Sequence, residues 1–399
     1  MTSLQNLIRI DKLFWIPYSM GLVIFKKVRK HNKYAENKNG KVIILKLLGM
    51  GSIIKLASVF EDFGVDKKKI SLITFIHNTE ICNLLGFHQN IYLRSKNPLV
   101  FIIDLIRTLL KSKKLRPNYI IDLERCSNAV GIYRLFMALL SRSKTISFGD
   151  KNFIMKNQND LIFSMKNLTH EELFLKILPY LKKNERARTR CDVQVDSSKI
   201  LVNVNASEYV LARRYPGKSY IKLIEAIHLW KSDLTFYLTG SQSEFRYVQQ
   251  LTNDLYSRGI NVRNVAGKWS LEMLTIQLSK CQLFITNDSG PMHLAAHLQI
   301  PTVVIWGPTH YKHFGYENTN YMYNVSLEMI CSPCFTNPKS NIGMSCKGKI
   351  NCIKDLYYEI VLGKVKFAFE HLGNFRSVAV PEGISLKVSI ENEKVIPIK

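Results

Sequence analysis

From residue 41 onward, short apolar runs alternate with longer segments in which apolar residues recur at helical spacing. Residues 41–47 are rich in Val, Ile and Leu, and residues 53–63 follow with the period of an amphipathic helix. Further strands are predicted at residues 70–76, 90–93, 119–123 and 145–148, and further helices at 80–85, 98–113 and 129–141. Strands that alternate with helices predict an α/β fold with a parallel sheet covered on both faces.

The pattern stops and restarts across residues 184–198, a charged stretch without apolar periodicity. Strands are then predicted at 199–204, 234–239, 262–265, 282–286 and 302–306, and helices at 218–230, 245–258, 271–279 and 290–298. We therefore divide the chain into an N-terminal segment (1–40), a first domain (41–190), a second domain (191–360) and a C-terminal helix and tail (361–399). Ligands of such sheets bind beyond the C-terminal ends of the strands, so a site is expected in a cleft between the domains.

The N-terminal segment contains an apolar and aromatic run at residues 14–25, interrupted by Pro17. This run is shorter than the ~18 residues that a spanning helix needs. A basic cluster at residues 26–30 stands where a signal peptide would carry its cleavage site. We therefore predict a cytoplasmic protein whose N-terminus lies in the interface of an anionic membrane. The alternative is a helix that packs on its own domain.

The charge of the chain is strongly asymmetric. Lys and Arg number 56 against 31 Asp and Glu, a net charge of +25, of which +20 falls in residues 1–190 and +5 in the rest. A coding bias toward Lys would act on both halves, so the asymmetry indicates that the first half faces an anionic partner. The chain lacks the interleaved aromatic and basic residues of single-strand binding and any recognition module, so no nucleic-acid partner is expected.

The segment from Asp288 to His293 carries the clearest chemistry, because it directly follows an apolar strand. Asp288 or Ser289 can cap the following helix, Gly290 lets a ligand approach the backbone, and Pro291 fits a first helical turn. With His293 in the same turns, the segment predicts an anion site at the positive end of a helix. The alternative is an ordinary capped helix.

These residues carry a family resemblance. Residues 286–296 (Thr-Asn-Asp-Ser-Gly-Pro-Met-His-Leu-Ala-Ala), with Ile-Pro-Thr-Val-Val-Ile-Trp-Gly-Pro-Thr at 300–309, resemble the signature of glycosyltransferase family 9, the heptosyltransferase family. Similar segments occur in family order at 213–216, 238–240, 266–272 and 331–334. The resemblance covers about residues 41–356 and is closer in the second domain. It implies the B-type glycosyltransferase fold, two Rossmann-like domains with a cleft between them.

The resemblance also implies roles for individual residues. The second domain would hold the nucleotide-sugar donor and the first domain the acceptor. Asp288, Ser289, Gly290, Met292 and His293 would surround the diphosphate. Arg213 would contact a phosphate, Glu272 the ribose hydroxyls, and Lys268 belongs to the same predicted set. Helix N–H groups with an Arg can stabilise a leaving diphosphate, so no catalytic metal is expected. The alternatives are a solvated Arg213 and an exposed helix carboxylate at Glu272.

The first domain departs from the family pattern at Ser52. The family places an Asp that acts as general base after a Gly in this loop, whereas this chain has Gly49-Met-Gly-Ser52. A Ser hydroxyl cannot act as a base without a partner. Asp122 and Glu124 follow a strand and point to one side of an extended chain, so we predict Glu124 as the replacement base. Alternatively, Asp122 caps a loop and Glu124 pairs with Arg125 or another base.

Four cysteines lie close together in the sequence, at Cys331, Cys334, Cys346 and Cys352. One Cys-x-x-Cys pair plus two more thiols in a Gly- and Lys-rich stretch is consistent with a structural zinc site. In a reducing cytosol this is favoured over two disulfides. A redox role is less favoured, because the pair does not open a thioredoxin-like helix.

The sequence thus predicts an inverting glycosyltransferase that moves a sugar from a nucleotide-diphospho sugar to a lipopolysaccharide or another lipid-linked glycan. ADP-heptose is the candidate donor, and the predicted location is the cytoplasmic face of the inner membrane. Two alternatives stay open: an inactive relative that binds nucleotide sugar or glycan, and a nucleotide-sugar epimerase of the same architecture.

Overall fold

The computed structural model describes residues 40–94, 97–124, 127–149, 160–164, 168–184, 188–206, 208–317, 319–334, 349–373 and 375–382. The chain divides into two compact units, Met1–Ala187 with Asn337–Lys339, and Arg188–Thr336 with Ser340–Lys399. The predicted interfacial segment at residues 1–39 lies outside the described residues.

The first unit is built on a six-stranded parallel sheet. Its strands are β1 (Val42–Leu45), β2 (Ile70–Phe75), β3 (Ile91–Leu93), β4 (Tyr119–Asp122), β5 (Lys144–Gly149) and β6 (Asp160–Ser164). Their order in the sheet is β3-β2-β1-β4-β5-β6. The chain therefore moves outward from β1 in one direction and then returns to the other side of β1 with β4. This reversal makes the β1–β4 junction the topological switch point, where open α/β sheets bind ligands.

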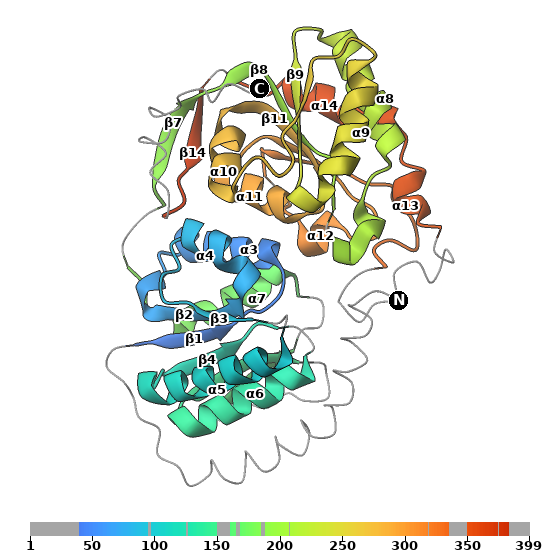
Figure 1. The fold of residues 1–399 in the computed structure, drawn as a ribbon. Coiled ribbons are helices and arrows are strands. Elements are labelled where there is room, and N and C mark those ends of the chain that lie inside the picture. The colour runs from blue at the N-terminus through green and yellow to red at the C-terminus, as the bar shows by residue number, and fades with distance from the viewer. Residues whose placement is uncertain are drawn as a thin grey trace. The chain divides into compact units, whose positions relative to one another are not determined.

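Helices cover both faces of this sheet (Figure 1). Helices α3 (Met50–Asp62), α4 (Thr79–Leu84) and α7 (His170–Ile177) lie on one face, and α5 (Pro98–Leu115) and α6 (Asn128–Ser141) on the other. Short 3-10 turns occur at η1 (Lys67–Lys69), η2 (Ile76–Asn78) and η3 (Leu178–Tyr180). Local sequence fixes the helix starts: Asn97 caps α5, which opens on Pro98, and Thr169 forms a capping box with Glu172 at α7.

The second unit repeats the same topology. Its strands are β8 (Asp196–Asn203), β9 (Thr235–Thr239), β10 (Val262–Asn264), β11 (Cys281–Asn287), β12 (Thr302–Ile305) and β13 (Met322–Val325), in the order β10-β9-β8-β11-β12-β13. All seven residues of β11 are buried, as expected for a central parallel strand covered on both faces. The switch point of this sheet lies between β8 and β11.

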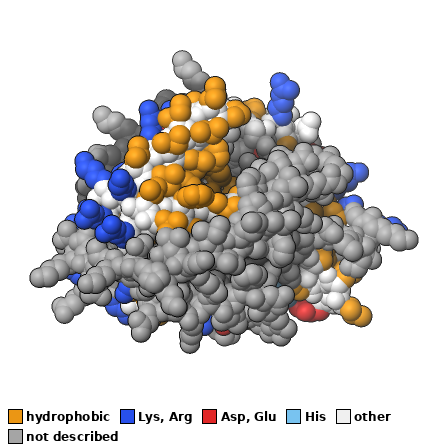
Figure 2. Space-filling view, turned by 90° about the horizontal axis from the view of Figure 1, so that it is seen from below, with side chains coloured by type: hydrophobic (Ala, Val, Ile, Leu, Met, Phe, Trp, Pro, Cys, Tyr) orange, Lys and Arg blue, Asp and Glu red, His pale blue; other side chains and the backbone are white. Residues whose placement is uncertain are grey.

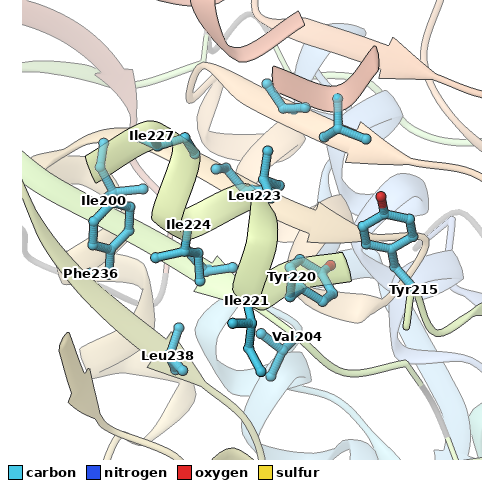
Figure 3. Packing of buried hydrophobic residues seen from close by; sticks show 14 of the residues in the cluster. Ile200, Val204, Tyr215, Tyr220, Ile221, Leu223, Ile224, Ile227, Phe236 and Leu238 are labelled. Carbon is cyan, nitrogen blue, oxygen red and sulfur yellow. The ribbon is translucent and has the colours of Figure 1, made fainter. Parts of the chain in front are cut away.

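Helices also cover both faces of the second sheet. Helices α8 (Gly217–Trp230), α9 (Phe245–Tyr256) and α14 (Tyr358–Phe369) pack together over one face, and α10 (Leu271–Lys280) and α11 (Gly290–Leu298) over the other. Shorter helical segments are α12 (Tyr311–Phe314), α13 (Asn351–Lys354), η4 (Glu208–Arg213) and η5 (Gln242–Glu244). Figure 3 shows Ile224 and Ile227 of α8 in one cluster with Ile200 and Phe236 of the sheet.

A two-stranded antiparallel ribbon lies outside this sheet. It pairs β7 (Arg190–Gln194) with β14 (Phe375–Ala379), so the end of the second unit returns to its beginning. The ribbon was not expected from the sequence. Both units have the Rossmann-like strand order, which confirms the predicted fold class of two Rossmann-like α/β domains. The cleft predicted between them stays a prediction.

Candidate functional site

Five polar residues meet at the switch point of the second unit. Strands β8 and β11 are neighbours, with Asn203 opposite Thr286. Their carboxyl ends therefore bring Asn203 and Asn205 beside Asn287, Asp288 and Ser289. All five of these polar residues are buried. Buried polar groups at this edge of an open sheet are where a ligand is expected.

Asparagine side chains fix the backbone of this edge. The Asn203 Nδ2 atom donates to Ser289 Oγ at 2.9 Å and to Thr286 Oγ1 at 3.1 Å. The Asn287 Nδ2 atom donates to the Asn205 carbonyl at 2.9 Å, and its Oδ1 accepts from the Tyr215 N–H at 2.9 Å. These hydrogen bonds join β8, β11 and the segment before α8. The loop that enters α11 is thereby held in one geometry, as a preorganised site requires.

The N-terminus of α11 has no side-chain cap. Ser289 occupies the N-cap position, but its hydroxyl accepts from Asn203 instead, and Asp288 pairs with Arg213. The expectation that Asp288 or Ser289 caps the helix is therefore wrong, because both side chains are engaged elsewhere. The N–H groups of the first turn are left for another acceptor, and the positive end of the helix dipole favours an anion.

Arg213 adds a cation at this edge. It is the last residue of η4, and its Nη1 lies 3.0 Å from Asp288 Oδ2. The Arg213 side chain is 17% exposed and that of Asp288 4% exposed. Its buried Nε has no hydrogen-bond partner within the described part of the chain. Arg213 is thus anchored by one nitrogen and retains a donor for an anionic ligand.

Three further buried polar atoms at the carboxyl ends of strands have no partner among the described residues. They are Asn205 Oδ1 after β8, Thr239 Oγ1 at the end of β9, and Thr309 Oγ1 after β12. Buried polar atoms are normally hydrogen-bonded, so unpaired ones indicate a ligand or water at this edge. Gly240 follows Thr239, and a Cβ there would lie 2.6 Å from Asn205 Nδ2. The close packing of Gly240 keeps Asn205 in place.

The remaining predicted donor residues occupy different environments. His293 is a half-buried residue of α11, and its Nδ1 atom lies 3.1 Å from the Tyr316 hydroxyl. Met292 is fully buried in a cluster with Trp306, so only its backbone N–H can face a ligand. Lys268 and Glu272 are exposed. Both follow β10, at the same end of the sheet but three strands from β11.

The switch point of the first unit brings Glu124 against the loop that follows β1. Leu45 pairs with Asp122 across β1 and β4. The Glu124 Oε1 atom accepts from Lys46 Nζ at 2.9 Å and from the N–H groups of Leu47 at 2.5 Å and Leu48 at 2.8 Å. The Lys46 and Glu124 side chains are 7% and 10% exposed.

One oxygen of Glu124 is therefore anchored by three donors. Its Oε2 makes no hydrogen bond within the described ranges, which leaves a positioned carboxylate oxygen at the carboxyl edge of the sheet. The pairing with a base was foreseen, but the partner is Lys46, and Arg125 lies outside the described residues.

Asp122 is fully buried behind Glu124. Its Oδ1 accepts from the Glu124 N–H at 2.9 Å, and its Oδ2 lies 3.7 Å from Arg134 Nε. Burial raises the pKa of Asp122 to about 7, although the charge of Arg134 opposes the shift. Asp122 thus positions the backbone of Glu124. Ser52 is half-buried in the first turn of α3, after Gly49, whose φ is 84°.

The four cysteines of the predicted zinc site are only partly described. Cys331 and Cys334 are half-buried in the segment after β13, Cys352 is buried in α13, and Cys346 lies outside the described residues. In the described part of the chain, no group of three or more His, Cys, Asp or Glu residues could hold a metal ion. The zinc site, which includes Cys346, stays a prediction.

The sequence model of glycosyltransferase family 9 (heptosyltransferase) matches residues 133–344, which is more than half of the chain. A lipooligosaccharide heptosyltransferase 2 of Campylobacter jejuni is 36% identical over 124 residues, 30% of this chain and 36% of the relative. The chain thus spans about a third of the length of the first curated relatives that it matches. A lipopolysaccharide heptosyltransferase 1 of Campylobacter coli is 26% identical over 301 residues, 67% of this chain and 84% of the relative.

Solved structures show the same fold. A family 9 glycosyltransferase of Veillonella parvula aligns with a TM-score of 0.58 at 15% identity, over 83% of this chain and 97% of that one. The E. coli heptosyltransferase WaaC with ADP aligns with a TM-score of 0.54 at 14% identity, over 82% of this chain and 99% of that one. Both similarities support the B-type glycosyltransferase fold.

Proposed function

Because this chain belongs to glycosyltransferase family 9, we propose that it is an inverting glycosyltransferase that moves heptose from ADP-heptose to a lipopolysaccharide core or another lipid-linked glycan. The observation that carries the proposal is the open N-terminus of α11 beside Arg213, at the switch point of the second unit. The curated relatives named above are heptosyltransferases. These similarities do not favour an inactive relative or a nucleotide-sugar epimerase.

The donor is proposed to bind to the second unit. Its diphosphate would lie against the first-turn N–H groups of α11, with Ser289, Gly290 and His293 around it and the backbone of Met292 facing it. Arg213 would contact a phosphate through its remaining donors. Lys268 and Glu272, at the β10 side of the same edge, are proposed for the nucleoside. E. coli WaaC with ADP provides a precedent for the nucleotide.

The transfer step places different demands on the two units. The acceptor oxygen would attack the anomeric carbon while the bond from that carbon to the diphosphate oxygen breaks. Negative charge then grows on the leaving ADP, where the α11 dipole and Arg213 stabilise it without a metal. The acceptor hydroxyl loses its proton, and we assign the proton to Glu124 Oε2, the oxygen that the loop donors do not occupy.

Ser52 and Asp122 have supporting parts in this scheme. Ser52 lies in the first turn of α3, just after the loop that Glu124 contacts, and its hydroxyl is proposed to face the acceptor. Asp122 is buried and out of reach of solvent. We propose that it acts as a positioning residue, because its carboxylate accepts a hydrogen bond from the Glu124 N–H. In this scheme the general base is Glu124, which follows β4, whereas the family pattern indicates a residue after the neighbouring strand β1.

The acceptor class also suggests where the protein works. A lipid-linked glycan with phosphate groups would be met at the cytoplasmic face of the inner membrane, and the charge of +20 in residues 1–190 fits such an anionic surface. No helix of the described residues is long and apolar enough to cross a membrane. Because of the charge of residues 1–190, we propose a peripheral association.

The zinc site is a separate proposal. Cys331, Cys334, Cys346 and Cys352 would hold one structural Zn²⁺ through four thiolates. Metal analysis of the purified protein should give one zinc per chain, and mutation of Cys334 to Ser should release it. A metal-free chain with unchanged stability would contradict this proposal.

A thermal-shift panel tests the donor class. We expect ADP and ADP-heptose to raise the melting temperature, because a ligand at about 100 times its Kd stabilises the native state by about 2.7 kcal/mol. UDP, GDP and CDP serve as matched controls with the same diphosphate. A shift with another nucleotide and none with ADP would contradict the assignment of the base.

A further inference from the structure

Helix α5 carries apolar side chains on two sides: Phe101, Leu105 and Leu109 pack against the core of the first unit, and a second row is exposed. Its buried side chains are those of Asp104, Thr108 and Ser112, which recur every four residues. Its exposed side chains include five aliphatic ones, between 45% and 72% accessible: Leu99, Ile102, Ile103, Ile106 and Leu110. At about 100° per residue, these five lie on the side of the helix opposite the polar stripe. A helix on a water-facing surface normally buries its apolar side.

The buried polar stripe is satisfied inside the first unit. Thr108 donates to the Asp104 carbonyl at 2.6 Å, and Ser112 donates to the Leu109 carbonyl at 2.7 Å. The Asp104 carboxylate accepts from Arg94 at 2.7 and 2.9 Å. The polar side of α5 therefore has partners within the fold, whereas the five aliphatic side chains on the opposite side are exposed.

Helix α6 extends the aliphatic surface. It packs beside α5, and the Tyr133 hydroxyl donates to the Leu105 carbonyl at 2.8 Å. Phe136 and Leu140 of α6 are 57% and 45% exposed. We call the five aliphatic residues of α5 with Phe136 and Leu140 the apolar face. Figure 2, which views the first unit from the side of α5 and α6, shows hydrophobic side chains gathered there beside Lys and Arg.

Basic residues lie beside the apolar face, mostly toward the C-terminal ends of α5 and α6. The exposed ones are Arg107, Lys111, Lys113, Lys114, Arg116 and Arg142. The sequences of α5 and α6 contain one acidic residue, Asp104, and it is buried and paired with Arg94. The surface is thus apolar in its middle and positive at its edge. Long basic side chains can place their stems on apolar surface and their charges in a polar layer.

We propose that this apolar face and its basic edge dock on an anionic lipid bilayer. Helix α5 would lie in the plane of the interface, with its aliphatic side chains at the acyl-chain boundary and its Lys and Arg side chains among the headgroup phosphates. The inference adds a docking surface to the proposed function. It rests on that function only for the lipid nature of the acceptor.

Charge argues against two other occupants. A second copy of this chain would bring six exposed basic residues against six more, with no acidic partner on α5 or α6. Residues 1–39 contain eight Lys and Arg but two Asp and Glu, so they would not neutralise the edge either. Anionic headgroups supply the charge that both lack.

Vesicle flotation of the full chain tests the proposal. Vesicles of phosphatidylcholine with about one-third phosphatidylglycerol are compared with phosphatidylcholine alone. We expect binding to the anionic vesicles that weakens with salt, and a loss of at least about tenfold for Leu110→Glu, because a leucine that would lie at the acyl-chain boundary is replaced by a charge. Leu229→Glu is the matched control: Leu229 is 82% exposed on α8, in the other unit.

The outcomes separate this proposal from the proposed function. Leu110→Glu should keep wild-type affinity for ADP and a wild-type melting temperature, which shows an intact fold and donor site. Binding by Leu110→Glu equal to that of wild type would overturn the proposal and assign docking to another segment. If light scattering shows that wild type is a dimer and Leu110→Glu a monomer, the occupant of the apolar face is instead a second copy of the chain. Absence of vesicle binding by wild type would overturn it as well.

Discussion

At the scale of single residues, Glu124 is the most informative side chain. Its Oε1 binds the loop after β1, where it accepts hydrogen bonds from Lys46 Nζ and from two backbone N–H groups. These contacts hold the carboxylate where β1 and β4 separate. A base must be placed before its proton affinity matters. The contacts thus give Glu124 a fixed position, and its Oε2 is the proton acceptor that we propose.

Glu124→Gln should abolish most turnover and leave donor binding intact. The amide oxygen can still accept from the loop N–H groups but cannot take a proton, so kcat should fall by about 10²–10⁴-fold. Calorimetry with ADP should give an unchanged Kd. Glu171→Gln is the control, because Glu171 is a half-exposed carboxylate of the same unit, 3.8 Å from Lys55. A Gln variant with normal turnover would exclude Glu124 as the base.

Arg213→Met should weaken ADP binding by about tenfold or more, because one charge-assisted hydrogen bond to phosphate is lost and Asp288 remains buried without its partner. Arg213→Lys should restore part of the affinity. Arg258→Met, at an exposed Arg paired with Glu225 at 3.1 Å, should bind ADP normally. Calorimetry measures all three, and equal affinities would remove Arg213 from the site.

The raised pKa of Asp122 should make the free energy of unfolding depend on pH. In the unfolded chain an Asp carboxyl has a pKa of about 3.9, and burial raises the pKa of Asp122 to about 7 in the fold. Between these values the folded state binds a proton that the unfolded state releases. The contribution of Asp122 is therefore complete below about pH 4 and is lost as the pH rises through about 7, by at most about 1.4 kcal/mol per pH unit.

Asp122→Asn should remove this contribution. Urea denaturation between about pH 5 and pH 8 should show that the free energy of unfolding of the Asn variant falls less steeply with pH than that of wild type. The constant cost of leaving Arg134 without a carboxylate does not affect the slope. Identical slopes would mean that Asp122 is ionised throughout.

Local sequence indicates some site residues and not others. The segment from Asp288 to His293 could be found because a strand, a Gly and a Pro mark a helix start. Asn203 and Asn205 could not, because short polar residues after a strand look the same in a site and in a loop. Lys46 is 78 residues from Glu124 in sequence, and no local pattern joins them.

At the scale of elements, one substitution at the N-terminus of α11 should have opposite effects on the stability of the helix and on ADP binding. Ser289→Asp would add a negative charge where the helix dipole is positive, which stabilises the helix and repels a diphosphate. We expect an unchanged or higher melting temperature and at least tenfold weaker ADP binding. Thr169→Asp adds the same charge at the N-cap of α7 and should leave ADP binding unchanged. Unaltered affinity in Ser289→Asp would contradict the anion site.

Hydrophobic periodicity predicts most strands and helices of both sheets, because each central strand is a continuous apolar run and each helix follows it. It does not predict the β7–β14 ribbon, whose strands are about 180 residues apart in sequence. It also identifies α5 as a helix without showing that a second row of aliphatic side chains faces outward. Which side of a helix is buried depends on the neighbours that tertiary packing supplies.

At the scale of the whole molecule, two similar Rossmann-like units differ in charge. The net charge of +20 in residues 1–190 falls largely in the unit proposed for the acceptor, which also carries the apolar face and its basic edge. The unit proposed for the donor carries only +5, and its proposed anion site consists of one helix end and Arg213. This division fits an enzyme that takes a diffusible nucleotide sugar and a glycan fixed in an anionic membrane.

The most direct test of this account is a transfer assay on the full chain with ADP-heptose and a heptose-deficient lipopolysaccharide acceptor. We predict release of one ADP for each heptose added, with an increase in acceptor mass of one heptose and no product without acceptor. ADP-heptose that is bound but never consumed, with these acceptors present, would contradict the account and identify a binding protein instead.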